Sequence, residues 1–191
     1  STSPLLAGVR IIESSLLGPG QISTFFSDLG ADVIKVEPPQ GDYIRQMTWP
    51  IINGVSLLHL HTHRGKRSIT LDLKTDEGKE IYKELVSGAD AVVEAMRPGT
   101  LSKLSLGYEV LKEVNPKVVF CTLSGYGASG PYQNMPSHGI AYDTWAGLIT
   151  PAATASCCSL LKPFSIVYES TSCRKCSIIF FTSSSNSFKA F

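Results

Sequence analysis

The sequence lacks both a strong charge of either sign and long apolar runs. Seventeen lysine and arginine residues face sixteen aspartate and glutamate residues, so the formal net charge is only +1. A nearly neutral chain has no overall field to gather nucleic acid or a membrane surface, and a small ligand is the better expectation. No apolar run approaches the roughly twenty residues of a spanning helix, and the first residues lack a signal-peptide pattern. We therefore expect a soluble protein, cytoplasmic or in a mitochondrial or peroxisomal matrix.

Cysteine is also scarce, and its distribution is uneven. The chain has five cysteines, an odd number, and four of them lie in residues 152–191 together with ten serines. This is not the pattern of a secreted disulfide framework. All sixteen glycines lie at or before Gly147. We predict a folded domain over residues 1–150 and an atypical Ser/Cys-rich tail over 151–191, whose only short apolar clusters are FSIVY and SIIFF.

Several common catalytic and phosphate-binding motifs are missing. The glycines at 18–20 do not have G-x-G-x-x-G spacing, the chain has no G-K-[ST] phosphate loop, and there is no G-x-S-x-G elbow of a serine hydrolase around Ser124 or Ser129. Gly-Pro-Gly at 18–20 precedes an expected helix, which leaves open a phosphate-binding turn, although a plain tight turn is favoured. CRKC at 173–176 has redox spacing without the strand-to-helix setting that such motifs need.

What the sequence does contain is an alternation of strands and helices. Apolar segments at 8–14, 32–39, 66–74, 90–96 and 117–127 are typical of strands. Amphipathic segments at 21–31, 75–89 and 100–116 are typical of helices, with Thr75 as an N-cap and Ile22, Phe25, Phe26 and Leu29 on one face. The pattern predicts the α/β class: a Rossmann-like open parallel sheet with flanking helices. In such sheets ligands bind beyond the carboxyl ends of the strands.

Two groups of side chains are candidates for chemistry. Arg64, Lys66, Arg67 and Lys74 form a basic region that is either a phosphate cradle or a solvated loop. His61 and His63, two residues apart in the expected loop, lack further ligands nearby, so a metal site is disfavoured. His138 follows the glycine-rich stretch SGYGASGP, where a histidine serves either as a structural hydrogen-bonding group or as an acid-base catalyst.

Several phrases together resemble a known family. LAGVRIIES with GPG, SDLGADVIKVEPPQGD, RGKRSITLDLKTDEGKE and VVEAMRPGTLSKLSLGYEVLKEVNPKVVFCTLSGYGASGPY occur in the order and spacing of the family III CoA-transferases. That family also includes the α-methylacyl-CoA racemases. The resemblance covers residues 5 to about 150, which correspond to the N-terminal part of the family. It implies a chain truncated relative to the family, with an unrelated tail.

The resemblance implies several residues that bind coenzyme A, which the spacing of residues in the sequence could not identify alone. It implies that coenzyme A is held by the LDLK segment, Leu71, Asp72, Leu73 and Lys74, beside Arg64 and Lys66. Ala95, Met96 and Lys103 are implied as further contacts, although many members have asparagine and an aromatic residue where Ala95 and Met96 stand. A contact segment around the histidine is implied for Ser137, Gly139, Ile140, Ala141 and Tyr142. CoA and acyl-CoA would be substrates, and no permanently bound cofactor or metal is expected.

The reaction implied by the resemblance is transfer of CoA between an acyl-CoA and a small carboxylic acid, by an interlocked homodimer. Transferases use an aspartate nucleophile about thirty residues after the position of His138, and this chain has none there; Glu169 lies near that spacing without the family's glycines. An α-methylacyl-CoA racemase, with His138 as acid-base, is one alternative. An inactive CoA-binding fragment or isoform is another.

Overall fold

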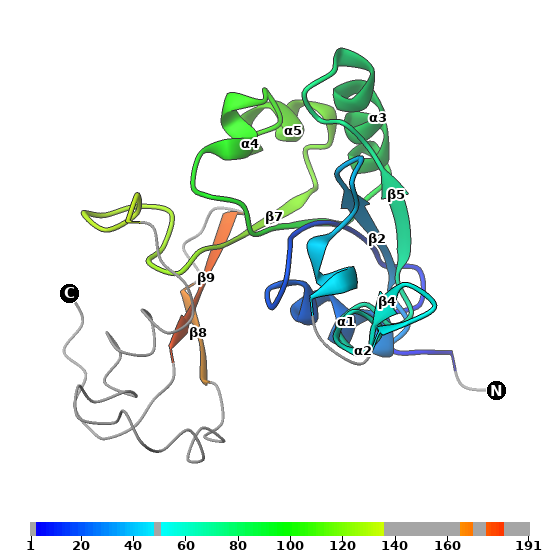
Figure 1. Ribbon diagram of the computed structural model, residues 1–191. Helices are drawn as coiled ribbons and strands as arrows, with labels where there is room; N and C mark the ends of the chain where they lie inside the picture. The colour runs from blue at the N-terminus through cyan, green and yellow to red at the C-terminus, as the bar shows by residue number, and fades with distance from the viewer. Residues whose placement is uncertain (1–2, 48–50, 136–164, 170–174, 182–191) are drawn as a thin grey trace, which may run out of the picture.

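A computed structural model describes residues 3–47, 51–135, 165–169 and 175–181, the last two ranges by their backbone. A seven-stranded sheet in the order β5-β2-β1-β6-β7-β9-β8 runs through the molecule (Figure 1). All neighbours are parallel except β8 and β9. The strands are β1 (Arg10–Ser14), β2 (Asp32–Glu37), β5 (Arg67–Thr70), β6 (Ala91–Glu94), β7 (Val119–Leu123), β8 (Ser165–Glu169) and β9 (Lys175–Phe181).

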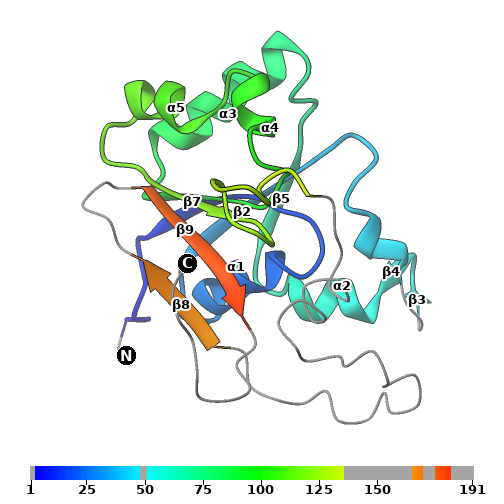
Figure 2. The ribbon, with the colours of Figure 1, turned by 90° about the vertical axis from the view of Figure 1, so that its left-hand side faces the viewer.

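Helices cover both faces of the sheet. In Figure 2 the sheet lies between α3 (Asp76–Ser87), α4 (Thr100–Lys103) and α5 (Tyr108–Val114) above, and α1 (Gly20–Asp28) and α2 (Leu57–Thr62) below. The alternation of strands and helices thus produced the predicted α/β fold with an open, mainly parallel sheet. Between β2 and α2 the chain adds a 3-10 turn, η1 (Tyr43–Gln46), and a small hairpin, β3 (Ile51–Ile52) with β4 (Val55–Ser56). The sequence analysis assigned neither these elements nor α2.

Alternate residues of the strands supply two apolar cores. Ile12, Ile34, Val92 and Phe120 face α3 and α5, where they pack with Tyr82, Val86 and Leu111 among others. Ile11, Val33, Val93 and Leu123 face the opposite side and pack with Ile22 of α1. Because both faces are buried, the strands are apolar nearly throughout instead of alternating with polar residues. Among the described residues, no helix is long and apolar enough to cross a membrane.

Helix α1 has a buried face that differs from the predicted one. Phe25, Phe26 and Leu29 are 56%, 36% and 44% exposed, whereas Gly20, Ser23 and Thr24 are buried. The helix lies over charged side chains of β1 and β2, which favour small and polar neighbours able to accept or donate hydrogen bonds. The apolar periodicity of residues 22–29 therefore indicated the helix but not the face that it buries.

The predicted helix over residues 100–116 is two short helices. The chain turns between α4 and α5, where Ser105 has φ 60° and the amide of Leu106 donates to the carbonyl of Leu101. Gly107 fits closely there, because a Cβ on it would lie 2.5 Å from Ser102 Oγ. The break leaves Tyr108 and Leu111 on the core side of α5.

Two strands occupy the apolar clusters of the tail. β8 and β9 coincide with FSIVY and SIIFF, and β9 pairs in parallel with β7 from Phe120 to Leu123. These residues therefore extend the sheet of the N-terminal segment. The division into a domain over 1–150 and a tail over 151–191 stays a prediction.

Candidate functional site

The strand order places the switch point of the sheet, where a crevice is expected in an open α/β sheet, between β1 and β6. From β1 the chain proceeds to β2 and β5 on one side, and then returns to β6 and β7 on the other, an order of 3-2-1-4-5. The loops that leave two adjacent strands therefore diverge at this point, which is where open α/β sheets bind ligands. Residues 15–19 after β1 and 95–99 after β6 border the crevice.

The turn at Gly18–Gly20 matches the plain-turn interpretation. The amides of Gly20, Gln21 and Ile22 donate to the carbonyls of Leu17, Gly18 and Pro19 at 3.0, 2.9 and 3.2 Å. A phosphate at a helix N-terminus needs such amides to be free. The start of α1 is therefore a closed turn, and we do not assign it a phosphate.

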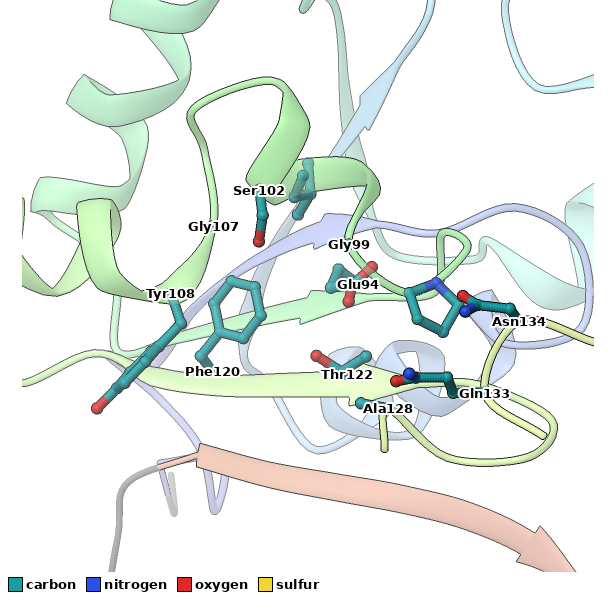
Figure 3. A pocket seen from close by; sticks show the side chains of 12 residues that line it. Glu94, Gly99, Ser102, Gly107, Tyr108, Phe120, Thr122, Ala128, Gln133 and Asn134 are labelled. Atoms are coloured by element: carbon teal, nitrogen blue, oxygen red, sulfur yellow. The ribbon is translucent and has the colours of Figure 1, made fainter. Parts of the chain in front are cut away.

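A pocket of about 300 Å³ lies at the carboxyl ends of β6 and β7 (Figure 3). Glu94 and Thr122 extend into it from the strands, Gln133 and Asn134 approach from the loop after β7, and Tyr108 and Phe120 lie on the side of α5. The pocket thus combines an apolar wall with amide, hydroxyl and carboxyl groups. This combination suits a partly polar small molecule.

Among the described residues that line this pocket, Glu94 is the one acidic side chain. It is 5% exposed, and its Oε2 accepts a hydrogen bond of 2.9 Å from the Met96 amide. Burial raises the pKa of the Glu94 carboxyl, against the opposing hydrogen bonds from the Met96 amide and the Thr122 hydroxyl. In its ionised form the group would attract donors such as amides and hydroxyls and would repel phosphates and carboxylates.

The LDLK segment forms a tight turn between β5 and α3. Asp72 Oδ1 accepts from the Lys74 amide at 3.0 Å, and Leu71 is buried with its amide donating to the Glu37 carbonyl at 2.9 Å. Thr75 caps α3 by accepting from the Gly78 amide at 3.1 Å, as predicted. Leu73 packs against the core. Lys74 is exposed, and no ion pair involves it in the described part of the chain.

Most of the predicted basic region is already neutralised by acidic side chains. Arg64 pairs with Asp28 at 2.5 Å, and Arg67 pairs with Asp32 at 2.6 Å. Lys66 is only 2% exposed and pairs with Glu13 at 2.6 Å. Of the four cations proposed for a phosphate cradle, Lys74 alone has no ion pair among the described residues. The CoA contacts of Arg64, Lys66 and Lys74 stay predictions, but the geometry supports Lys74 best.

His63 does not lie in a loop beside His61. It follows α2 as the C-cap, is buried, and stacks on His59 with ring centroids 4.5 Å apart. Its Nδ1 lies 2.8 Å from the Thr62 hydroxyl. His61 is exposed on the helix. Among the described residues no three potential ligands gather in a metal-binding cluster.

The other predicted contacts lie just after β6, in α4 or outside the described residues. Ala95 leaves β6 with its amide donating to the Ser14 carbonyl at 3.2 Å, and Met96 packs against the core of the α3 side. Lys103 is exposed in the last turn of α4. The segment Ser137, His138, Gly139, Ile140, Ala141 and Tyr142 lies outside the described residues. The contact of each with CoA stays a prediction.

The sequence analysis missed the buried charges near the crevice. Glu13 and Lys35 are neighbours in the parallel register of β1 and β2, and both are completely or almost completely buried. Asp42 and Glu94 are buried as well. The available signal was a charged residue inside an otherwise apolar strand, in RIIES, DVIKVE and AVVE. Such a residue is costly to bury without a partner and therefore indicates a specific contact.

Comparison with known proteins identifies the family. The CoA-transferase family III sequence model matches residues 6–171. The chain belongs to this family. It is 38% identical over 169 residues to the succinyl-CoA–L-malate CoA-transferase beta subunit of Chloroflexus aurantiacus, covering 81% of this chain and 41% of that protein. It is 39% identical over 147 residues to the succinyl-CoA:glutarate CoA-transferase of Mus musculus, covering 76% and 33%.

The family's solved structures share the fold. The crystal structure of a CAIB/BAIF family protein from Brucella suis superposes with a TM-score of 0.72 at 38% identity, covering 76% of this chain and 40% of that one. The chain thus spans about 40% of the length of the Chloroflexus aurantiacus and Brucella suis proteins. The match to residue 171 extends about twenty residues beyond the segment in which the motifs were recognised.

Proposed function

We propose that this chain is the CoA-binding N-terminal part of a family III CoA-transferase, an enzyme that moves coenzyme A between an acyl-CoA and a small carboxylic acid. The observation that carries the proposal is the family match over residues 6–171 on a sheet whose β1/β6 crevice is the site expected for a ligand. Lys74, which is exposed after β5 and has no ion pair among the described residues, supplies a cation for a CoA phosphate. The pocket beside Glu94 supplies a partly apolar wall for a neutral part of the ligand.

The reaction itself would need groups beyond the described residues. His138 is the chain's candidate acid-base residue, and the family's aspartate nucleophile has no counterpart at the expected spacing. The two relatives named above act on succinyl-CoA with a dicarboxylic acid. Succinyl-CoA with malate or glutarate is therefore the first substrate pair to assay. Transfer without an added partner would show that the chain is catalytically self-sufficient. CoA binding without transfer would favour the alternative of an inactive CoA-binding fragment.

Calorimetric titration with CoA tests the proposal. We expect saturable binding, and we expect Lys74→Ala to weaken it roughly tenfold, the equivalent of about 1.4 kcal/mol. Lys117→Ala is the matched control, because Lys117 is also exposed but precedes β7 and so lies at the opposite end of the strands. Absence of CoA binding by a folded chain would refute the proposal, and equal effects of the two substitutions would refute the role of Lys74.

A further inference from the structure

Four charged side chains are buried together beneath the loops that leave β1 and β2. They are Glu13, Lys35, Asp42 and Lys66, and none is more than 2% exposed. Two carboxylates face two ammonium groups, so the group is neutral as a whole. Lys35 Nζ lies 3.2 Å from Glu13 Oε1 and 3.0 Å from Asp42 Oδ2, and Lys66 Nζ lies 2.6 Å from Glu13 Oε2.

The two ammonium groups also hold the backbone at both ends of the 15–20 loop. Lys35 Nζ donates to the Ser15 carbonyl at 2.6 Å, where β1 ends. Lys66 Nζ donates to the Gly20 carbonyl, where α1 begins. Glu13 reinforces both ends, because it accepts from the Ser15 hydroxyl at 2.6 Å and from the Ser23 hydroxyl. The loop is therefore fixed through side chains from β1, β2 and the start of β5.

The geometry of the loop indicates that it needs this support. Leu17 has φ 60°, a left-handed conformation that costs a side-chain-bearing residue about 1 kcal/mol or more. At Gly20 a Cβ would lie 3.0 Å from Glu13 Oε1 and 3.1 Å from His63 Nε2. A strained residue and a close backbone approach persist only where the surroundings determine them. The same group of charges reaches the next loop, since Asp42 caps η1 by accepting from the Ile44 amide at 3.1 Å.

Stability alone does not account for these charges. Desolvation offsets most of the attraction within a buried ion pair, and well-packed apolar side chains of similar volume often stabilise a protein equally well. The ammonium groups donate directional hydrogen bonds to particular carbonyls, which apolar side chains cannot do. Both carbonyls belong to the loop that borders the β1/β6 crevice, where a ligand is expected.

We propose that Lys35 and Lys66 are positioning residues, which together with Glu13 hold the 15–20 loop in its ligand-binding shape and do not contact the ligand. The inference rests on the proposed function, in that the ligand is taken to be CoA. It reassigns Lys66, which the family resemblance implied as a neighbour of the CoA phosphates. The Lys66 side chain is only 2% exposed, and its ammonium group already bonds to Glu13 and Gly20, which leaves it little access to a phosphate.

Hydrogen exchange without CoA tests the clamp directly. In Lys66→Met we expect the amides of Gly20, Gln21 and Ile22 to exchange at least about tenfold faster than in the unmodified chain. The amides of Phe120 and Cys121 in β7 report global opening, and the increase at the loop should exceed any increase there. The charge-matched pair Glu13→Gln with Lys66→Met serves if the single variant unfolds, and the same local loss of protection is expected. Lys66→Arg should retain much of the protection. Equal changes at the loop and at β7 would overturn the inference.

The salt dependence of CoA binding separates a positioning lysine from a phosphate ligand. Phosphate contacts weaken as salt rises, so Lys74→Ala should flatten the dependence of CoA affinity on salt. Lys66→Met should weaken binding by a similar factor at every salt concentration. If Lys66→Met flattens the salt dependence as Lys74→Ala does, Lys66 is a phosphate ligand and the inference is wrong. If the unmodified chain binds no CoA, the proposed function fails, while the exchange measurement still decides whether the clamp exists.

Discussion

His63 is a buried imidazole among charged side chains, and its ionisation has a consequence for stability. Burial and the nearby ammonium groups of Lys35 and Lys66 lower the pKa of His63 to about 4, against the opposing influence of Glu13. The unfolded chain would bind a proton near pH 6.5, whereas the folded chain would not until about pH 4. The stability that the neutral ring contributes is therefore complete above pH 6.5 and is lost as pH falls through this window.

We predict that the free energy of unfolding falls between pH 6.5 and about 4 more steeply in the unmodified protein than in His63→Gln, by roughly 3 kcal/mol over the window. Urea titrations at half-unit pH intervals measure both curves. His61→Gln is the control, because His61 is exposed on the same helix. Parallel curves for the unmodified protein and His63→Gln would contradict the prediction.

At the scale of elements, α1 approaches β1 unusually closely at Gly20. A Cβ added to Gly20 would lie 3.0, 3.1 and 3.3 Å from Glu13 Oε1, His63 Nε2 and Ser15 Oγ. These atoms are buried, and most are fixed by hydrogen bonds, so they have little room to move. Gly20→Ala should therefore destabilise the protein by about 1–2 kcal/mol. Gly18→Ala, where nothing lies within 4 Å of the new methyl, should change stability by less than about 0.5 kcal/mol. Chemical denaturation distinguishes them.

The turn before α3 connects packing to the proposed CoA contact. A Cβ on Gly78 would lie 2.1 Å from the Asp72 carbonyl oxygen, so Gly78→Ala must displace the turn that carries Lys74. We expect a loss of about 1–3 kcal/mol in stability together with weaker CoA binding. At Gly88, the C-cap of the same helix, the new methyl would meet only Arg10 Nη1 at 3.7 Å. Gly88→Ala should alter neither stability nor CoA binding. Normal CoA binding by a folded Gly78→Ala variant would argue against a contact between the LDLK segment and CoA.

The sequence predicted elements better than it predicted the environment of their side chains. The cap residue Thr75 and the alternation of strands and helices could be recognised from the sequence, because capping and periodicity are local properties. The buried face of α1 could not be recognised from the sequence. It depends on Glu13 and Lys35, which become neighbours only when β1 pairs with β2. Likewise, the positive charges of Arg64, Lys66 and Arg67 indicated a phosphate cradle, while their partners Asp28, Glu13 and Asp32 lie more than thirty residues away in sequence.

At the scale of the whole molecule, the two helical layers differ in what they leave exposed. The outer side of α1 presents Phe25, Phe26 and Leu29 at 56%, 36% and 44% exposure, and Leu5 is 81% exposed in the N-terminal segment, whose Leu6 amide donates to the Leu29 carbonyl at 3.0 Å. A group of large apolar side chains on one surface favours association with another protein surface. The resemblance to the family implies a homodimer, and the exposed side of α1 is a surface on which that expectation can be tested.

We predict that the chain self-associates through this face. Sedimentation velocity over a range of concentrations should show a weight-average coefficient that rises with concentration. Phe25→Lys combined with Leu29→Lys should reduce that rise, because both side chains lie on the exposed side and their removal leaves the cores intact. Ile81→Lys on α3, 41% exposed in the opposite layer, is the matched control and should associate like the unmodified chain. A monomer at every concentration, or an equal effect of Ile81→Lys, would show that the α1 face is not the contact.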